Sequence, residues 1–514
     1  MKDISKNKLF IFGTIFFLIG IFLHNFLLNI KLSFIIAILL LFYLFNFWIY
    51  AKKFSIYLLV IFFSFLFWII YSNFYNEKIL EKQNFVGQFY DNKKHKIIFE
   101  IVEVNKKLDF SVNYIGKIKQ IDEKKVEKDI WKIKILIKIP RNYDIALWEK
   151  LEIYEKITEI KSFSDSFDYK NFLKTKDIFI VVRPFNLKFL EKENKKNDNI
   201  FLEKKENFNK NLQKFRKRFI EIVHIIYPEK EAIFLAWILI GAREEIPKDL
   251  KDNFNNSGLT HLIAVSGFNI TIIVIFLSFL FKFLPVYLRV FLVTSFIIVF
   301  TMIVWANPAV IRASIMWVLA YFIISSGRKG DSLAILLFTA FAMTIYNPLV
   351  LNFDVSFHLS FLAVLGLLYT QRFWEKVFYF LPSLFAIKES FVLTLSAFSF
   401  TIPIVMFNFG QISVLSPIAN MLVGWAIPFA MLFGFLAVLL YFISPALWIL
   451  FWVIDYIFLK YVIVIVTIFW EFKYSIFKVD FWEYARFLEI IYFIFLVFLI
   501  LFFRKKNKIK KISK

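Results

Sequence analysis

The chain has 514 residues, of which 59% are hydrophobic and 21% are aromatic, with a mean hydropathy of +0.65. Soluble domains are roughly 45–50% apolar, so this composition excludes an ordinary soluble enzyme, a disordered tail and a secreted disulfide scaffold. The net charge is +23 although only 20% of the residues are charged, and the chain has no cysteine. These values predict a polytopic membrane protein with its basic residues gathered into segments, and they exclude thiolate metal sites and cysteine nucleophiles.

Three apolar stretches open the chain, at residues 9–30, 32–51 and 54–75. Each is close to the roughly 20 residues that cross a hydrocarbon core. Lysines precede the first stretch, and Lys52 and Lys53 separate the second from the third. Because Lys and Arg are enriched on the cytoplasmic side, we expect a three-helix membrane region over 1–75 that starts in the cytoplasm and leaves the membrane on the outside.

Residues 76–228 are rich in Lys, Glu, Asp and Asn and contain short strand-like runs. In the clearest run, 131–139, isoleucines at 133, 135, 137 and 139 share one face, and Lys132, Lys134 and Lys138 lie on the other. Further runs lie at 97–104, 110–119, 151–160 and 178–182. Such short strands predict an extracellular OB-like small β-barrel domain over 76–189. A charged helical connector over 190–229 is expected next.

From residue 230 the sequence is again compatible with lipid. We expect nine further spans, near 261–284, 286–305, 309–326, 331–346, 355–371, 389–407, 412–442, 446–470 and 485–503. Residues 231–242 are too short to cross, which suggests a re-entrant or interfacial segment. The predicted fold is therefore a polytopic α-helical membrane protein of about 12 transmembrane helices, multi-pass in the cell membrane. It has a membrane domain over 230–503, a basic tail over 504–514, and both termini in the cytoplasm.

Polar residues within these spans are informative, because a charge at the bilayer centre costs about 2.5–3.5 kcal/mol even on the mildest scale. Arg312 follows Asn307-Pro308, and Asp354 and His358 follow Asn347-Pro348. None of the five histidines is at metal-ligand spacing, and no glycine-rich nucleotide-binding loop is present. We therefore expect no metal, no cofactor and no catalytic residues.

Several motifs carry a family resemblance. The run SGLTHLIAVSG at 257–267 resembles the ComEC family of competence proteins, the membrane DNA channels of natural transformation. Four further matches follow in the order of the family: PAVIRA at 308–313, FHLSFLA at 357–363, FGQ at 409–411 and SPIAN at 416–420. Upstream, SFDYKNFL at 166–173 resembles the end of the extracellular OB-like domain of that family. The resemblance covers essentially the whole chain.

The chain also departs from the family pattern. Family members usually have a histidine where this chain has Asn269, and a glutamine where it has His358. Longer members carry a C-terminal metallo-β-lactamase-like domain with a metal motif. This chain stops about ten residues past its last expected span, so we expect a short form without nuclease activity, not an enzyme, with strand degradation left to a separate nuclease.

The resemblance implies passage of single-stranded DNA into the cytoplasm during natural transformation. It makes the following residues candidates for the DNA path: Arg312, His261, Ser266, Asn269, Gln411 and Asn420. Arg312 could instead only lock the helix bundle, and His261 and Ser266 could serve helix packing. Asp354 and His358 are candidates for a helix cap and for interior packing.

Lys132, Lys134 and Lys138 are candidates for DNA contact outside the membrane, although a solvated strand face is the commoner explanation for such a pattern. The implied partners are single-stranded DNA, an extracellular DNA receptor, a cytosolic helicase-like ATPase and membrane lipids. Two rival functions stay open at this point. One is a membrane enzyme acting on a lipid-linked glycan, as a polymerase or ligase, and the other is a degenerate relative of the channels that no longer transports.

Overall fold

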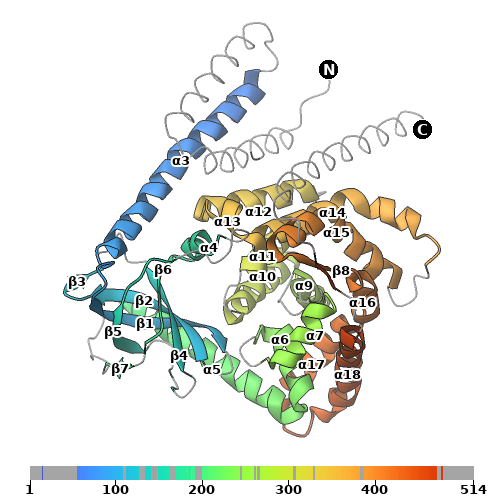
Figure 1. Ribbon diagram of the computed structural model, residues 1–514. Coiled ribbons are helices and arrows are strands. Elements are labelled where there is room, and N and C mark those ends of the chain that lie inside the picture. Colours follow the sequence, from blue (N-terminus) through green and yellow to red (C-terminus); the bar gives the residue numbers. More distant parts are fainter. Residues whose placement is uncertain are drawn as a thin grey trace. The chain divides into compact units, whose positions relative to one another are not determined.

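The chain folds into two compact units, one made of residues 1–198 and 333–354 and the other of residues 199–332 and 355–514. The structure is a computed structural model (Figure 1). It describes residues 14, 55–107, 111–126, 133–140, 143, 145, 149–160, 168–184, 186–190, 200–242, 246–259, 262, 267–304, 308–327, 330–381, 387–471 and 476–478. The expected spans at 9–30, 32–51 and 485–503 lie outside the described residues, apart from Thr14.

The first unit starts with the long helix α3 (Ser55–Gly87). The expected third span, 54–75, covers its first two thirds. The helix continues past Tyr75 because no proline or glycine interrupts the chain before Gly87.

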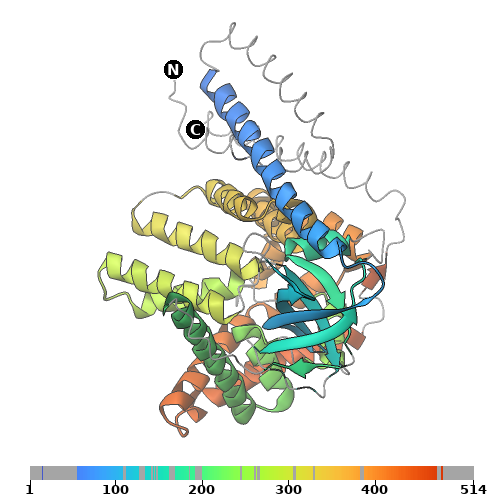
Figure 2. The same cartoon turned by 90° about the vertical axis from the view of Figure 1, so that its left-hand side faces the viewer.

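Seven strands form the sheet of this unit, in the order β6-β4-β2-β1-β5-β7, with β3 paired to β2. They are β1 (Lys94–Lys107), β2 (Ser111–Ile121), β3 (Lys124–Lys125), β4 (Lys134–Pro140), β5 (Lys150–Lys156), β6 (Ile178–Val182) and β7 (Lys188–Phe189). All pairs are antiparallel except β4 with β6. Figure 2 shows how strongly the strands turn from one edge of the sheet to the other. Each of the five predicted strand runs contains a strand, although β5 ends at Lys156, four residues before the end of the predicted run 151–160.

Alternation along β4 places its isoleucines in the core. Ile133, Ile135, Ile137 and Ile139 are fully buried together with Phe99 of β1. On the opposite face of the strand, Leu136 is also buried, because the short helix α4 (Tyr169–Thr175) packs over it through Leu173. The lysine face of β4 is therefore partly covered by a helix and is not a fully solvated surface.

Two more helices complete this unit, α12 (Ser332–Tyr346) and α13 (Val350–Phe353). Asn347, in the turn between them, donates from Nδ2 to the carbonyl oxygen of Thr175 at 2.7 Å. Leu349 enters the core of the sheet. The Asn347-Pro348 break thus joins this helix pair to α4.

The second unit is helical. Its described helices are α5 (Ile200–Ile226), α6 (Glu229–Ile240), α7 (Lys248–Asn256), α9 (Gly267–Leu280), α10 (Val286–Ile303), α11 (Pro308–Ser325), α14 (Val355–Val377), α15 (Ile387–Phe409), α16 (Ser416–Val423), α17 (Ala426–Ile443) and α18 (Ile449–Glu471). A small two-stranded antiparallel sheet pairs β8 (Gln411–Ser413) with β9 (Ile476–Lys478).

Five described helices are long and apolar enough to cross a membrane: α10, α11, α15 as far as Met406, α17, and α18 as far as Trp470. Four of them, α10, α11, α15 and α18, agree with expected spans, and all five support a membrane protein. The segment 412–442, expected as one span, instead contains β8, α16 and α17, with a break at Gly424-Trp425 between the two helices.

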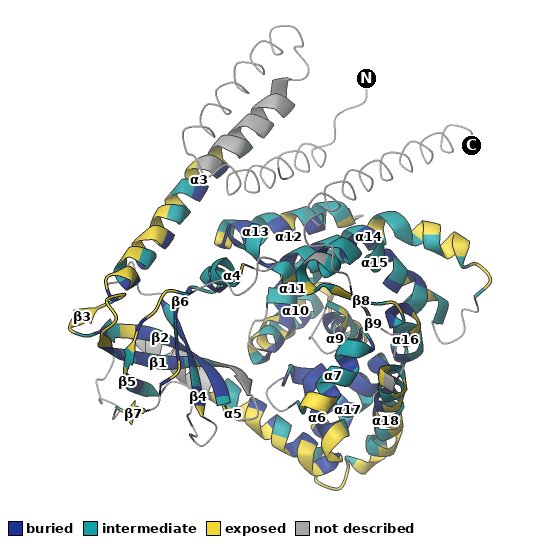
Figure 3. Ribbon diagram, in the orientation of Figure 1, coloured by how far each residue is buried: buried dark blue, intermediate teal, exposed yellow. Residues whose placement is uncertain are grey.

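Helix α6 lies at the centre of this unit, and apart from its exposed first two residues, Glu229 and Lys230, most of it is buried (Figure 3). Its residues Ala232–Ile240 are all buried, as expected of a helix that is apolar all round. Gly434 of α17 lets the helices approach, because a Cβ there would lie 2.5 Å from Leu235 Cδ1. The segment 231–242 is therefore a core helix and not an interfacial one.

Candidate functional site

The family-like motifs contact one another within the second unit, and the first contact joins the loop after α7 to α16. Gly258 has a φ of +73°, and its carbonyl oxygen accepts a 3.0 Å hydrogen bond from Ser416 Oγ. A Cβ at Gly258 would lie 2.5 Å from Ser416 Cβ and 2.7 Å from Ser413 Cβ. Only glycine combines this left-handed backbone with so close an approach, so the SGL and SPIAN motifs interlock here.

The next contacts join α16 to α15 and α15 to α14. Asn420 donates from Nδ2 to Thr394 Oγ1, and Ser390 Oγ donates to the Asn420 carbonyl oxygen at 3.2 Å. Between α15 and α14 the backbones nearly touch, since a Cβ at Gly366 would lie 2.2 Å from the carbonyl oxygen of Ser396. The SPIAN motif is thereby tied to the helix that begins with the FHLSFLA motif.

Arg312 joins α14 to α11. Its side chain is 1% exposed, and Nη2 donates to the Ser356 carbonyl oxygen at 2.7 Å and to Ser356 Oγ at 3.2 Å. The next residue, Ala313, packs against α9, because its Cβ lies 3.4 Å from where a Cβ of Gly267 would be. A buried arginine that bonds a neighbouring helix fastens the two helices by a charge-assisted contact.

These contacts form a closed circuit, because α9 follows in the chain from the loop that holds Gly258. We call this circuit the motif ring; its members are residues 257–259, α16, α15, α14, α11 and α9. Three helices of the ring make these contacts within their first two turns, through Gly267 in α9, Arg312 in α11 and Ser356 in α14. Helix N-termini carry partial positive charge, so the ring gathers three such ends and one guanidinium.

Asn269, the residue that replaces the usual histidine of the family, is 2% exposed. Its Nδ2 donates to the carbonyl oxygen of Ile238 at 2.8 Å. That carbonyl lies in the last turn of α6, where no intrahelical donor is available. Asn269 thus satisfies a buried acceptor and ties the motif ring to the central helix.

The other predicted residues of the membrane domain lie at different places. Gln411 is exposed in β8, opposite Lys478 of β9. Asp354 is buried and directly precedes α14, the position of a helix cap, and His358 is half-buried in the first turn of that helix. His261, Ser266 and Lys132 lie outside the described residues.

On the sheet, Lys134 and Lys138 are both half-buried. Lys138 pairs across the strands with Asn113 of β2, and its pKa is lowered by burial and by the nearby charge of Arg183, which follows β6. Two cations therefore lie together at this edge of the sheet. Sequence reasoning missed Arg183, because only the parallel pairing of β4 with β6 brings it next to Lys138.

Sequence reasoning also missed Arg216, within the basic run 214–218. Its side chain is buried, and Nη1 donates at 3.0 Å to the carbonyl oxygens of Ile240 and Ile303, the last residues of α6 and α10. The available signal was its spacing, since Arg216 shares a helical face with the buried Phe219 and Val223.

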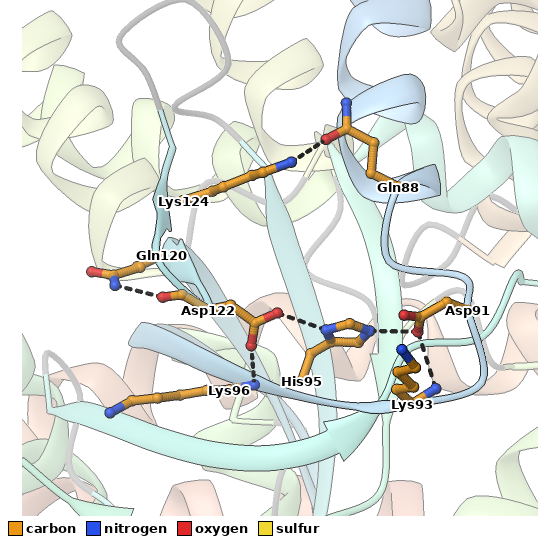
Figure 4. Close-up of polar contacts among 8 residues, drawn as sticks. All are labelled: Gln88, Asp91, Lys93, His95, Lys96, Gln120, Asp122 and Lys124. Atoms are coloured by element: carbon orange, nitrogen blue, oxygen red, sulfur yellow. Dashed lines mark hydrogen bonds and ion pairs between the residues drawn. The ribbon is translucent and has the colours of Figure 1, made fainter.

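A third overlooked group is His95 at the start of β1 (Figure 4). Its Nε2 lies 2.7 Å from Asp91 Oδ1, and its Nδ1 lies 2.7 Å from Asp122 Oδ2. Burial opposes the charged imidazole, but the hydrogen bonds and charges of Asp122 and Asp91 outweigh it and raise the pKa of His95. Because each carboxylate binds a different ring nitrogen, the arrangement clamps two turns and is not a chelating metal site.

Comparisons with known proteins agree with this arrangement. The family model described as "Competence protein" matches residues 238–506, which include every element of the motif ring. An uncharacterized protein of Aquifex aeolicus (strain VF5) is 29% identical over 218 residues, and ComE operon protein 3 of Bacillus subtilis (strain 168) is 24% identical over 220 residues. Each alignment covers 42% of this chain, but only 49% and 27% of the respective relative.

The chain thus spans about half of the length of the first relative and about a quarter of that of the second. No solved structure matches the chain at a significant level. The family model alone covers more than half of the chain and contains the motifs that interlock in the ring. The chain therefore belongs to the ComEC family of competence proteins.

Proposed function

We propose that this chain is a membrane channel that passes single-stranded DNA into the cytoplasm during natural transformation. The observation that carries the proposal is the motif ring. Motifs that are as much as 158 residues apart, from Gly258 to Ser416, meet through close contacts in one circuit. A family role in DNA uptake and a ring of helices around shared motifs fit a translocation path better than a lipid-facing enzyme groove.

The chemistry of the cargo favours this arrangement. A strand of DNA carries a charge on every phosphate, and bare phosphates do not enter hydrocarbon, so a path needs positive or dipolar walls. Three helix N-termini and the guanidinium of Arg312 supply positive potential in the ring. Arg312 is 1% exposed while α11 and α14 are packed together. In our proposal its positive charge therefore attracts the strand without direct contact as long as these two helices stay packed.

The sheet unit would guide the strand from outside. The first strand pairs with β2 and β5, β2 pairs with β4, and β4 runs parallel to β6; this five-strand order supports an OB-type fold, a fold used for single strands. A phosphate bound between Lys138 and Arg183 would be stabilised by both cations, since it would relieve their mutual repulsion. About 12 spans, an external sheet unit and cytoplasmic termini complete the proposed topology.

Energy and processing would come from partners. The proposed set is an extracellular DNA receptor, a cytosolic helicase-like ATPase and a separate nuclease, with the chain itself acting as a channel and not as an enzyme. In our proposal this division of labour is suggested by the family resemblance, and the sequence shows no glycine-rich nucleotide-binding loop of its own.

The test is complementation in a competent host that lacks its own channel but keeps its receptor and nuclease. The measured quantity is labelled DNA that reaches a nuclease-protected cytoplasmic pool. Three chains are compared: the parent, Arg312→Ala, and Arg372→Ala as a matched control, since Arg372 is an exposed arginine of α14.

Rescue by the parent and the control, but not by Arg312→Ala, is the expected result. Equal rescue by all three would keep the channel and remove Arg312 from the path. Absence of rescue by a correctly inserted parent chain would reject the channel, provided that a native channel expressed from the same vector restores uptake. In that case glycan ligation by the same membranes becomes the activity to assay.

A further inference from the structure

Asp455 of α18 places a carboxyl group in the core of the second unit, where its exposed fraction is 0%. Other parts of the chain contribute buried residues beside it. They are Tyr227, between α5 and α6, and Gly434 of α17, which Leu235 of α6 also approaches. A carboxylate buried this completely is rare in proteins unless a cation or hydrogen bonds compensate its charge.

The carboxyl group occupies the space that Gly434 leaves on α17. A Cβ at Gly434 would lie 2.9 Å from Oδ2 of Asp455 and 2.5 Å from Cδ1 of Leu235. The oxygen is therefore close to the backbone of α17, and the space on this side could not accept even a methyl group. Any ligand that the carboxyl group binds here must be very small.

Hydrogen bonds do not compensate the acid. Within the part of the chain that the structure describes, neither oxygen of the Asp455 carboxyl group accepts a hydrogen bond. The hydroxyl of Tyr227 lies beside the carboxyl group but does not complete a hydrogen bond of normal geometry with it. Burial, and then the charge of Asp455, raise the pKa of Tyr227, so this hydroxyl keeps its own proton.

No cation balances the acid either. Helix α18 packs against α6, α7, α16 and α17, and among the described residues of these helices no charged side chain interacts with Asp455. Lys460 of α18 itself is exposed and lies over the ring of Tyr456, with 5.4 Å between Nζ and the ring centroid. An ionised carboxylate at this position would therefore lose its hydration without any compensating charge.

A proton compensates the acid better than a metal ion would. Hard metal ions such as Ca²⁺ and Mg²⁺ take about six or more oxygen ligands. The described side chains at this place supply two carboxyl oxygens and one hydroxyl, next to the apolar Leu235 and Gly434. A proton needs one oxygen and no additional space, and it removes the charge that burial penalises.

We propose that Asp455 is a proton-binding site in the core of the second unit. One carboxylate oxygen takes up a proton, and the group is a neutral acid while α6, α17 and α18 are packed around it. The proton is released to water when these helices separate, because water can then solvate the carboxylate. Proton binding therefore stabilises the packed helices. The site does not rest on the proposed DNA transport, because it depends on the contacts of core residues alone.

The first measurement detects the bound proton by infrared spectroscopy of the full chain in nanodiscs at neutral pH. An un-ionised carboxyl group absorbs apart from carboxylates, and isotopic labelling of the aspartate carboxyl carbon assigns its band. We expect such a band in the parent chain and its loss in Asp455→Asn. Asp249→Asn is the matched control, because Asp249 is an exposed aspartate of α7, and it should keep the band. A parent chain without the band, or a band that survives in Asp455→Asn, overturns the proposal.

The second measurement follows unfolding of the same three chains in mixed micelles as a function of pH. A group that is protonated in the folded chain and ionised in the unfolded chain raises the unfolding constant by up to about tenfold per pH unit. Above a pH of about 4, where an unfolded aspartate ionises, the ratio of the unfolding constants of the parent and Asp455→Asn should therefore rise with pH. The ratio of the parent to Asp249→Asn should stay constant.

A constant ratio of the parent to Asp455→Asn over the whole pH range overturns the proton site. Sodium is tested at constant pH and ionic strength, with choline as the replacement cation. Stabilisation of the parent chain by sodium that is absent in Asp455→Asn also overturns the proposal, because it assigns the carboxyl group to a metal cation.

Discussion

Arg312 and Ser356 hold α11 and α14 together through a bond from a charged side chain to the backbone of the neighbouring helix. Nη2 of Arg312 donates to the Ser356 carbonyl oxygen at 2.7 Å, and the arginine is 1% exposed. The two residues lie 44 positions apart, in two separate helices. This hydrogen bond therefore holds the positive charge of Arg312 near the N-termini of both α11 and α14.

The first prediction concerns this bond. Arg312→Ala removes a hydrogen bond from a charged group, for which we expect a loss of about 1.5–3 kcal/mol in the free energy of unfolding. Arg312→Lys keeps the charge but loses the planar fork, so it should retain DNA uptake if charge is the essential property. Thermal unfolding and the uptake assay measure the two effects separately. Full uptake with a destabilised Arg312→Ala chain would reduce the residue to a structural role.

The second prediction tests the interlock at Gly258. Gly258→Ala must place a side chain 2.5 Å from Ser416 Cβ at a left-handed φ of +73°. Strain and overpacking together should cost about 2–5 kcal/mol. Gly327→Ala is the matched control, because Gly327 has a φ of +70° with nothing within 4 Å, so it carries the backbone strain alone. Equal unfolding temperatures for the two variants would contradict the close approach of the two motifs.

The third prediction concerns Asn269. Asn269→Ala leaves the Ile238 carbonyl oxygen buried without this donor, which should cost about 1–3 kcal/mol of stability. Asn269→His, the residue usual in the family, keeps a ring nitrogen as a donor and should recover part of that loss. Asn408→Ala serves as the control, since Asn408 bonds Ile404 within its own helix at 2.8 Å. The prediction fails if Asn408→Ala is as destabilising as Asn269→Ala.

The fourth prediction concerns the cation pair of the sheet. Lys138→Gln/Arg183→Gln should weaken binding of single-stranded DNA to the full chain in nanodiscs. It should also reduce the slope of log affinity against log salt by about 0.7 for each phosphate that the variant no longer binds. Lys125→Gln/Lys156→Gln removes the same charge from exposed positions of the sheet unit and should leave the slope unchanged. Identical slopes for the two variants would remove this edge from the DNA path.

The fifth prediction concerns the pH dependence of the His95 clamp. The pKa of His95 is raised in the folded chain. Its stabilising contribution is therefore fully present below its unfolded value of about 6.5 and is lost as the pH rises through the folded value. The reporter is the amide of Lys96, which donates to Asp122 Oδ1 at 2.8 Å.

Hydrogen exchange of that amide, corrected for the intrinsic effect of pH, should show protection that decreases toward alkaline pH. His95→Gln should have lower protection that no longer varies with pH in this range. Asp122 has a φ of +49°, so Asp122→Asn is the suitable second variant, because asparagine tolerates the left-handed region. Parallel pH profiles for the parent chain and His95→Gln would refute the clamp.

The local elements were readable in the sequence wherever one periodicity dominated. Alternation at 131–139 predicted the buried isoleucines of β4, and long apolar runs predicted α10, α11 and α18. The prediction of a single span over 412–442 was wrong, because the hydropathy of this segment gives no sign of the break between α16 and α17. Gly424 ends α16 there, where a Cβ would lie 2.5 Å from Ser390 Oγ of the neighbouring helix.

The sequence by itself determined the membrane class, the strand runs and the family, because hydropathy, alternation and motif order are properties of neighbouring residues. Only the tertiary structure decided which polar groups are buried and what they bind. Arg216 and Lys217 are adjacent in the chain, yet one is buried against two helix ends and the other is exposed. The motif ring likewise depends on partners far apart in the chain, because a buried hydrogen bond is set by packing and not by sequence distance.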